Sequence, residues 1–312
     1  MASLDLKVED ASGDILTEKT FHLLRGFLQP DTSLTLDSTA QSILDLLSPY
    51  APHSTEVWVF GETCIELAEQ IPYYHPSQLK FAELLEYLGQ SAVFGQIDTA
   101  TSPNKRKYHR YQRLGESLRD ALNTTEPENA NAYANFHAFA ANIHERRIFR
   151  TNPTWAIWAQ REAHETAGKE QGRYRDGYVL AAAQWILWYG QSLFKQVLFP
   201  GEISSRDLQR WKPGPLYCGK AYLSLQRWHF WRDGFKSVAS GEKEKVEWVS
   251  QECTNVAAKA AEMMDSMERN MTFDASDRLT IFGKGHARHE VGDASRSGFP
   301  NFGFLRHFRR HS

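Results

Sequence analysis

Apolar residues recur along most of this chain at spacings of three and four, which places them on one face of an α-helix. No convincing series of alternating apolar and polar residues, the pattern of strands, is present. The pattern therefore predicts an all-α fold, as an irregular multi-helix bundle or helical array. In the first part of the chain, proline and polar stretches separate helices expected at about 14–28, 37–48, 54–70, 77–90 and 108–122.

The second part has longer apolar stripes and clearer end signals. Helices are expected at about 127–147, from Pro153 with Asn152 as N-cap, at about 174–198, and at about 216–238 with a stop near Gly241. A last apolar stripe runs from Val246 to Met267. Because the 174–198 segment is apolar nearly all round, it is expected to be a central helix.

One all-helical domain is expected over residues 1–275, divisible into sub-bundles at 14–122 and 127–270. From about Phe282 glycines interrupt the pattern, so residues 282–312 are expected to form a flexible tail that mixes basic and aromatic side chains. Such a composition can hold single-stranded RNA by charge and stacking. Short basic ends are common without that function, and we do not expect nucleic acid as a partner.

Composition narrows the class of protein. The net charge of −2 over 312 residues provides no global attraction to nucleic acid or to an anionic membrane. Three cysteines without a C-x-x-C pair indicate neither a disulfide framework nor structural zinc. The first residues lack the apolar stretch of a secretory signal, and the longest apolar run, Tyr178–Tyr189, is too short to span a bilayer. We therefore expect a cytoplasmic protein without membrane contact.

Three Trp-x-x-Trp pairs stand out: Trp155 with Trp158, Trp185 with Trp188, and Trp228 with Trp231. Residues three apart share a helix face, so each pair either forms a packing ridge where helices cross or lines a ligand cavity. The two interpretations are compatible, and both stay open. The candidate ligand-binding residues are the six tryptophans together with Tyr189, which adds a polar tip, and Arg232, which flanks the third pair.

Histidines are the candidate acid–base groups, although no catalytic residue is established. His137 and His144 are seven residues apart and share one side of the 127–147 helix, and His164 lies on the following helix near Glu165. Imidazole can move a proton near neutral pH, but a histidine hydrogen-bonded at the edge of the core is the ordinary alternative. The chain contains no Glu-x-x-His and no His-Glu-x-x-His motif, so no metal site is expected.

Arginines cluster near the same segments. Arg146, Arg147, Arg150 and Arg161 surround the loop after the first histidine helix, while Arg227 and Arg232 flank the third tryptophan pair. Solvated ion pairs are the default expectation. An arginine that points into the tryptophan region would favour a carboxylate, an enolate or a phosphate, but the pattern does not select which arginine does so.

The usual cofactor motifs are absent. The chain has no Gly-x-Ser-x-Gly elbow, no P-loop and no Gly-x-Gly-x-x-Gly after a strand. Common hydrolases, nucleotide triphosphatases and dinucleotide enzymes are therefore not favoured, and no cofactor is expected.

The segments Asn135-Phe-His-Ala-Phe-Ala-Ala141 and Trp155-Ala-Ile-Trp158-Ala159, with the apolar helix around Trp185, resemble a fungal protein family of unknown function. That family is labelled after the oxopyrrolidine biosynthesis cluster protein G, and the similarity extends over most of residues 15–270. The resemblance implies a fungal cytosolic all-α protein, in some members encoded beside polyketide or polyketide–amino acid hybrid pathways. It supplies no catalytic residues.

We therefore expect an accessory protein of fungal secondary metabolite biosynthesis that binds a hydrophobic small molecule, with other pathway proteins as further candidate partners. If it is an enzyme, it is expected to be non-redox and metal-independent. The alternative is a non-enzymatic helical scaffold for protein–protein interaction, which would have a solid core and an exposed apolar groove.

Overall fold

The computed structural model describes residues 2–8, 15–47, 55–91, 94, 112–124, 126–148, 153–167, 174–241 and 249–272. The chain divides into two units, Met1–Thr272 and Phe273–Ser312. The predicted tail at 282–312 lies outside the described residues. Within those residues all regular structure is helical, which confirms the all-α helical array.

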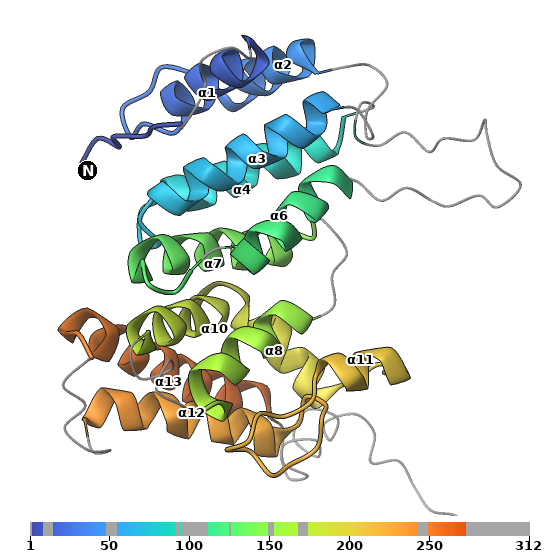
Figure 1. The fold of residues 1–312 in the computed structure, drawn as a ribbon, viewed down its shortest axis with the longest axis vertical. Helices are drawn as coiled ribbons and strands as arrows, with labels where there is room; N and C mark the ends of the chain where they lie inside the picture. The colour runs from blue at the N-terminus through green and yellow to red at the C-terminus, as the bar shows by residue number, and fades with distance from the viewer. Residues whose placement is uncertain are drawn as a thin grey trace, which may run out of the picture. The chain divides into compact units, whose positions relative to one another are not determined.

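The first part of the chain forms the helices that were predicted, with ends that differ by a few residues. These are α1 (Ile15–Phe27), α2 (Leu36–Leu46), α3 (Thr55–Gln70), α4 (Ser77–Gly89) and α6 (Gln112–Thr124). Helix α1 packs on α2 and α3, α2 packs on α4, and α3 packs on α6 (Figure 1). Their apolar faces enclose a first hydrophobic core.

The second part contains two elements that were not predicted, a short helix and one π-helical turn. Its elements are α7 (Ala130–Glu145), α8 (Thr154–Gln160), the π-helix η1 (Arg161–Glu165), α10 (Arg175–Leu198), α11 (Ser205–Arg210), α12 (Leu225–Ser240) and α13 (Gln251–Met271). Helix α10 contacts α7, α8, η1, α12 and α13, so the prediction of a central helix is confirmed (Figure 1). None of the helices in the described part of the chain combines the length and the apolar character needed to cross a membrane.

Two predicted helix starts were too early. Helix α7 begins after Asn129, whose side chain accepts a hydrogen bond from the Ala132 N–H, and not at Pro127. Helix α12 begins after Ser224, which caps it in the same way, and not at residue 216. Residues 216–224 are not helical, and two of their backbone groups bind elsewhere: the Leu216 N–H donates to the Glu165 carbonyl at 2.9 Å, and the Ala221 carbonyl accepts from Arg227. The predicted stop at Gly241 is confirmed by its left-handed φ of 66°.

Helix α7 lies between two hydrophobic cores, and every residue from Ala134 to His144 is buried. Phe136 and Phe139 join the core built by α1–α6. On the other side Ala138 and Ala141 join the core built around α10. Because alanine adds little bulk, α7 and α10 can approach each other closely along this side.

A buried asparagine ties α7 to the turn before α4. Asn135 Oδ1 accepts a hydrogen bond from the Tyr73 N–H at 2.7 Å, and its Nδ2 donates to the Glu69 carbonyl at 2.8 Å. Gln78 Nε2 donates to the Ile71 carbonyl at 2.7 Å in the same turn. These side chains satisfy backbone groups that the two cores would otherwise leave without partners.

We predict that Asn135→Ala lowers the free energy of unfolding by about 2–3 kcal/mol, since it removes the hydrogen bonds to the buried Tyr73 N–H and to the partly buried Glu69 carbonyl. Urea denaturation followed by circular dichroism measures the change. Asn131→Ala, an exposed position on the same helix, is the control and should change stability by less than about 0.5 kcal/mol. Equal effects of the two substitutions would contradict the assigned role.

Candidate functional site

Five of the candidate residues meet where α7, α8 and α10 pack together. Trp185 Nε1 donates a hydrogen bond to His137 Nδ1 at 2.8 Å. The His144 ring lies 4.9 Å from the Trp185 ring, 5.9 Å from the Tyr189 ring and 5.4 Å from the Trp155 ring, measured between centroids. The structure therefore brings one tryptophan from each of two pairs together with two of the three histidines, but inside the core.

Burial keeps both imidazoles of this cluster neutral. It lowers the pKa of His137 to about 3 and that of His144 to about 4, the latter partly opposed by a hydrogen bond to the Ala140 carbonyl. His137 Nδ1 accepts from the indole, so its proton is on Nε2. His144 Nδ1 lies 2.7 Å from the carbonyl oxygen and so carries the proton. With 2% and 5% of their surface exposed, these rings orient Trp185 and are closed to solvent.

His164 lies apart from that pair, in η1. Its ring contacts Phe235 of α12 at a centroid distance of 4.3 Å. Gly234 makes room for it, because a Cβ there would lie 2.5 Å from His164 Nδ1. Burial, and secondarily the charge of Arg175, lowers the pKa of His164 to about 3, so this imidazole is also neutral.

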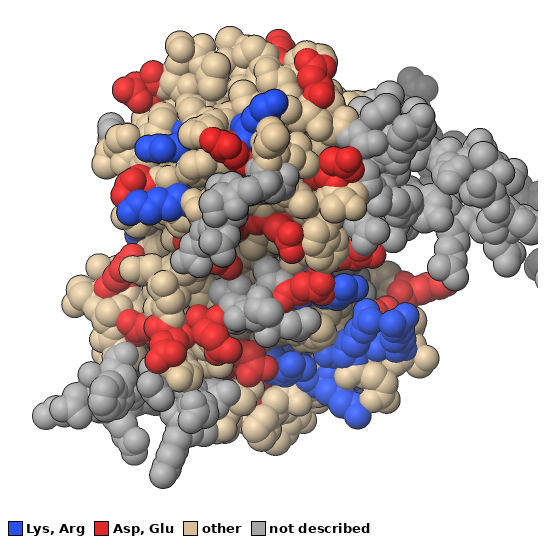
Figure 2. All heavy atoms as spheres, turned by 45° about the horizontal axis from the view of Figure 1, so that its top comes forward, with Lys and Arg blue, Asp and Glu red and all other residues tan. Residues whose placement is uncertain are grey.

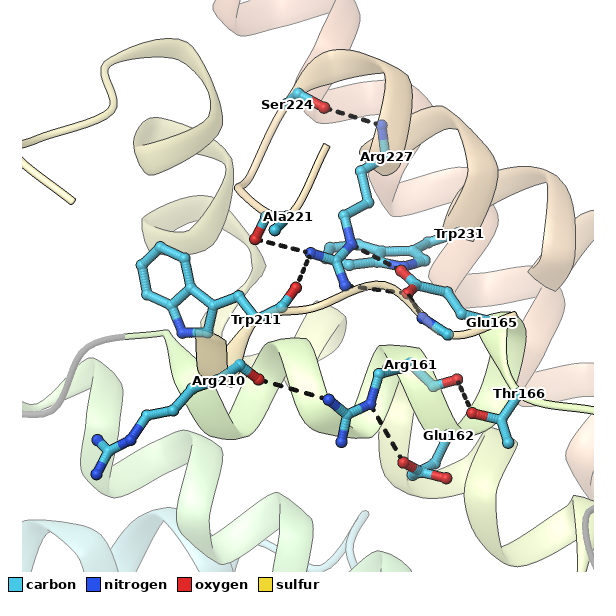
Figure 3. Close-up of polar contacts among 11 residues, drawn as sticks. Arg161, Glu162, Glu165, Thr166, Arg210, Trp211, Ala221, Ser224, Arg227 and Trp231 are labelled. Carbon is cyan, nitrogen blue, oxygen red and sulfur yellow. Dashed lines mark hydrogen bonds and ion pairs between the residues drawn. The ribbon is translucent and has the colours of Figure 1, made fainter. Parts of the chain in front are cut away.

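Beside His164, Glu165 and Arg227 form an ion pair in which both side chains have 0% exposure (Figure 3). The guanidinium binds the carboxylate in a bidentate manner, with Nε to Oε1 at 2.7 Å and Nη2 to Oε2 at 3.0 Å. Trp231 Nε1 donates to Oε1 at 2.7 Å, and the Gly214 N–H donates to Oε2 at 2.9 Å. The carboxylate thus accepts four hydrogen bonds, and we call this set of residues the Glu165 clamp.

The third guanidinium nitrogen of Arg227, Nη1, connects the clamp to the turn before α12. Nη1 donates to the Trp211 carbonyl at 2.9 Å and to the Ala221 carbonyl at 3.3 Å. The guanidinium also lies 5.3 Å from the Trp231 ring centre. A buried ion pair is tolerated when further hydrogen bonds accompany it, and here the carboxylate accepts four and the guanidinium donates four. Gly214 is required, because a Cβ there would lie 2.4 Å from the Glu165 carbonyl oxygen.

The other candidate residues take separate positions. Trp228 packs on Phe194, with ring centroids 4.8 Å apart. Trp158 Nε1 donates to the Arg210 carbonyl at 2.9 Å. Arg232 faces α13 and pairs with Asp265 at 3.3 Å and with Glu268 at 3.0 Å. These residues do not converge on one cavity. Among the described residues, no group of three His, Cys, Asp or Glu side chains is arranged to hold a metal ion.

Trp188, in contrast, lies at the surface in a groove between α10 and α13 with a volume of about 410 Å³. The groove is lined by Glu145, Ile186, Leu187, Trp188, Gly190, Gln191, Met263, Ser266, Met267, Asn270 and Met271. Gly190 allows Met267 to lie against α10, since a Cβ there would be 2.7 Å from the methionine Cε. We call this feature the Trp188 groove.

The importance of Glu165, Arg227 and Gly214 was not predicted. Arg227 appeared only as one of several flanking arginines, and Glu165 only as a neighbour of His164. One signal was present: Arg227 precedes Trp231 by four residues and Phe235 by eight, so it shares their buried helix face. An arginine on such a face needs a buried partner, but the spacing alone does not name it.

A protein-family model described as a protein of unknown function, DUF3632, matches residues 62–235, which is more than half of the chain. The matched region includes η1, Gly214 and Arg227, and ends at Phe235. No curated protein and no solved structure matches this sequence.

We predict that Arg227→Met lowers the free energy of unfolding by about 3–5 kcal/mol, because it leaves the Glu165 carboxylate buried without its counter-charge. The double variant Glu165→Leu/Arg227→Met should lose less than the single one, since it removes both charges. Urea denaturation of the three proteins measures both differences. A double variant less stable than the single one would contradict this account of the clamp.

Stability should also fall with acid because of the three buried histidines. Their folded pKa values, about 3, 4 and 3, lie below the ordinary value of about 6.5. Only the unfolded state therefore takes up these protons as the pH falls below about 6.5. Stability is complete above that pH and declines toward pH 4, by up to about 1.4 kcal/mol per pH unit for each histidine.

Urea denaturation between pH 7 and pH 4.5 tests this. His144→Asn retains a donor toward the Ala140 carbonyl but does not titrate in this range. It should therefore reduce the slope of the free energy of unfolding against pH by the contribution of one histidine. Phe194→Leu changes packing against Trp228, away from the three histidine rings, and should lower stability equally at every pH. An unchanged slope in His144→Asn would show that this imidazole is not kept neutral.

Proposed function

The chain belongs to the DUF3632 family of proteins of unknown function, and we propose that it binds a hydrophobic small molecule in the Trp188 groove. The observation that carries this proposal is a surface groove of about 410 Å³ that combines an indole with three methionines. Its volume lies within the range of small-molecule sites. In this proposal Trp185, Trp228 and Trp231 belong to the hydrophobic core and do not contact the ligand.

The groove has the chemistry of an adaptable apolar site. Met263, Met267 and Met271 stand one helical turn apart along α13, and their flexible thioether side chains can fit ligands of varied shape. Trp188 offers a flat face opposite them, and its Nε1 donates to Gln184 Oε1 at 3.1 Å, which fixes the ring. Glu145 supplies a polar group at the edge that can orient a ligand.

Binding is better supported than proton-transfer catalysis. His137, His144 and His164 are neutral and buried, so a ligand in the groove does not meet an accessible acid or base among them. Neither His144 nor Tyr189, which contact each other, lines the groove. The groove therefore supports a role in holding a molecule and keeping it from water.

As part of the same proposal, the protein is an accessory component of fungal secondary metabolism that acts in the cytoplasm. The resemblance at Asn135–Ala141 and Trp155–Ala159 supports this role. The ligand would be a polyketide or polyketide–amino acid intermediate, and its apolar carbon chain suits the methionine wall.

We predict that a medium-chain β-ketoacyl thioester of N-acetylcysteamine quenches the fluorescence of the wild-type protein in a saturable manner. Trp188→Leu should weaken binding by at least about 10-fold, because it removes the flat wall of the groove. Isothermal titration calorimetry gives the affinity independently of the lost fluorophore.

Trp158→Phe is the matched control, since Trp158 is a partly exposed tryptophan outside the groove. It should retain wild-type affinity. Equal weakening in both variants, or no heat of binding with wild type, would count against the groove as the ligand site.

A further inference from the structure

The segment between α10 and α12 is exposed to an unusual degree. Helix α11, which lies within it, buries none of its side chains. Four of the ten exposed large apolar side chains in the described residues fall between positions 199 and 225: Phe199, Leu208, Leu216 and Leu225. Phe199 is 77% exposed. Exposed apolar side chains that are concentrated in one segment of the chain are available for contact with another molecule.

Basic side chains occupy the same segment. Arg206 and Arg210 on α11 and Lys212 just after it are exposed. Figure 2 shows Lys and Arg side chains gathered at the lower right of the face, where α11 lies. In Figure 3 the side chain of Arg210 points away from the Glu165 clamp. We call Phe199, Leu208, Leu216, Leu225, Arg206, Arg210 and Lys212 together the α11 surface.

Hydrogen bonds from large side chains hold this exposed segment in place. Trp211 Nε1 donates to Thr154 Oγ1 at 2.8 Å, and Trp158 Nε1 donates to the Arg210 carbonyl at 2.9 Å. Arg227 holds the Trp211 carbonyl at 2.9 Å. Three large side chains thus order a segment whose only helix contributes nothing to the core. Pre-organisation of this kind lowers the entropy cost of binding a partner.

We propose that the α11 surface binds an acidic amphipathic helix of a partner protein. The exposed phenylalanine and leucines provide an apolar centre for its leucine-type face. Arg206 and Arg210 can bind its carboxylates in bidentate fashion, and this charge complementarity selects an acidic partner. Arginine beside aromatic and apolar anchors is the composition of protein interfaces.

A membrane surface is the alternative occupant, and it fits less well. Helix α11 has six residues and a single leucine. Helices that lie in a membrane interface carry a long continuous apolar face, which this segment lacks. The proposal concerns residues outside the Trp188 groove, so it stands or falls independently of ligand binding there.

The test uses two labelled synthetic helices, one with leucine on one face and glutamate on the other, and one with lysine in place of glutamate. Fluorescence anisotropy should show that the full-length protein binds the glutamate helix and not the lysine helix. Arg206→Glu/Arg210→Glu should weaken binding at least about 10-fold, and Phe199→Ser about 5-fold. Lys259→Glu, an exposed lysine on α13, should retain wild-type affinity.

All four positions are exposed, so the variants should unfold at the wild-type temperature, and circular dichroism checks this. Equal binding of both helices, or undiminished binding in the double arginine variant, would overturn the proposal. Sedimentation with phosphatidylcholine–phosphatidylserine vesicles provides the second arm. Vesicle binding that needs Arg206 and Arg210, without binding of the glutamate helix, would assign the surface to a membrane instead.

Discussion

The charges of Glu165 and Arg227 can remain buried because the carboxylate accepts four hydrogen bonds and the guanidinium donates four. Their partners come from η1, the turn at Trp211–Gly214, the Ala221 carbonyl and α12. Each of these segments must therefore keep its place for the others to do so. The pair joins residues 62 positions apart in the chain, and it converts an irregular stretch between two helices into ordered structure.

This constraint separates the interior from the surfaces that can bind other molecules. Most tryptophans of the three Trp-x-x-Trp pairs lie in the interior. Trp185 contacts two neutral histidines, Trp231 donates to Glu165 within the clamp, and Trp228 packs on Phe194. Among the accessible features of the described residues are the Trp188 groove between α10 and α13 and the α11 surface. The proposed functions use these accessible features, with the clamp supporting the second one directly.

Most helices could be predicted from apolar periodicity because helices buried on one face must repeat it, and α10 was recognisable as central because it is apolar nearly all round. The irregular parts could not. The π-helix η1 has no sequence pattern of its own, and α11 has no apolar stripe because none of its side chains is buried. In residues 216–224, the Leu216 N–H binds the carbonyl of distant Glu165, a contact that local sequence does not show. The candidate site could be placed only in part, because spacing puts each tryptophan pair on one helix face, whereas only packing shows that Trp185 and His144 meet.

The most direct test of the clamp is amide hydrogen exchange at Gly214 and Leu216, whose N–H groups donate to the Glu165 carboxylate and carbonyl. Comparison of the wild type with Arg227→Met, under conditions where both are folded, isolates the effect of the ion pair. If the pair orders the turn, both amides lose protection in the variant, while amides of α3 and α4 keep theirs. Unchanged protection at Gly214 and Leu216 would show that the turn is ordered without it.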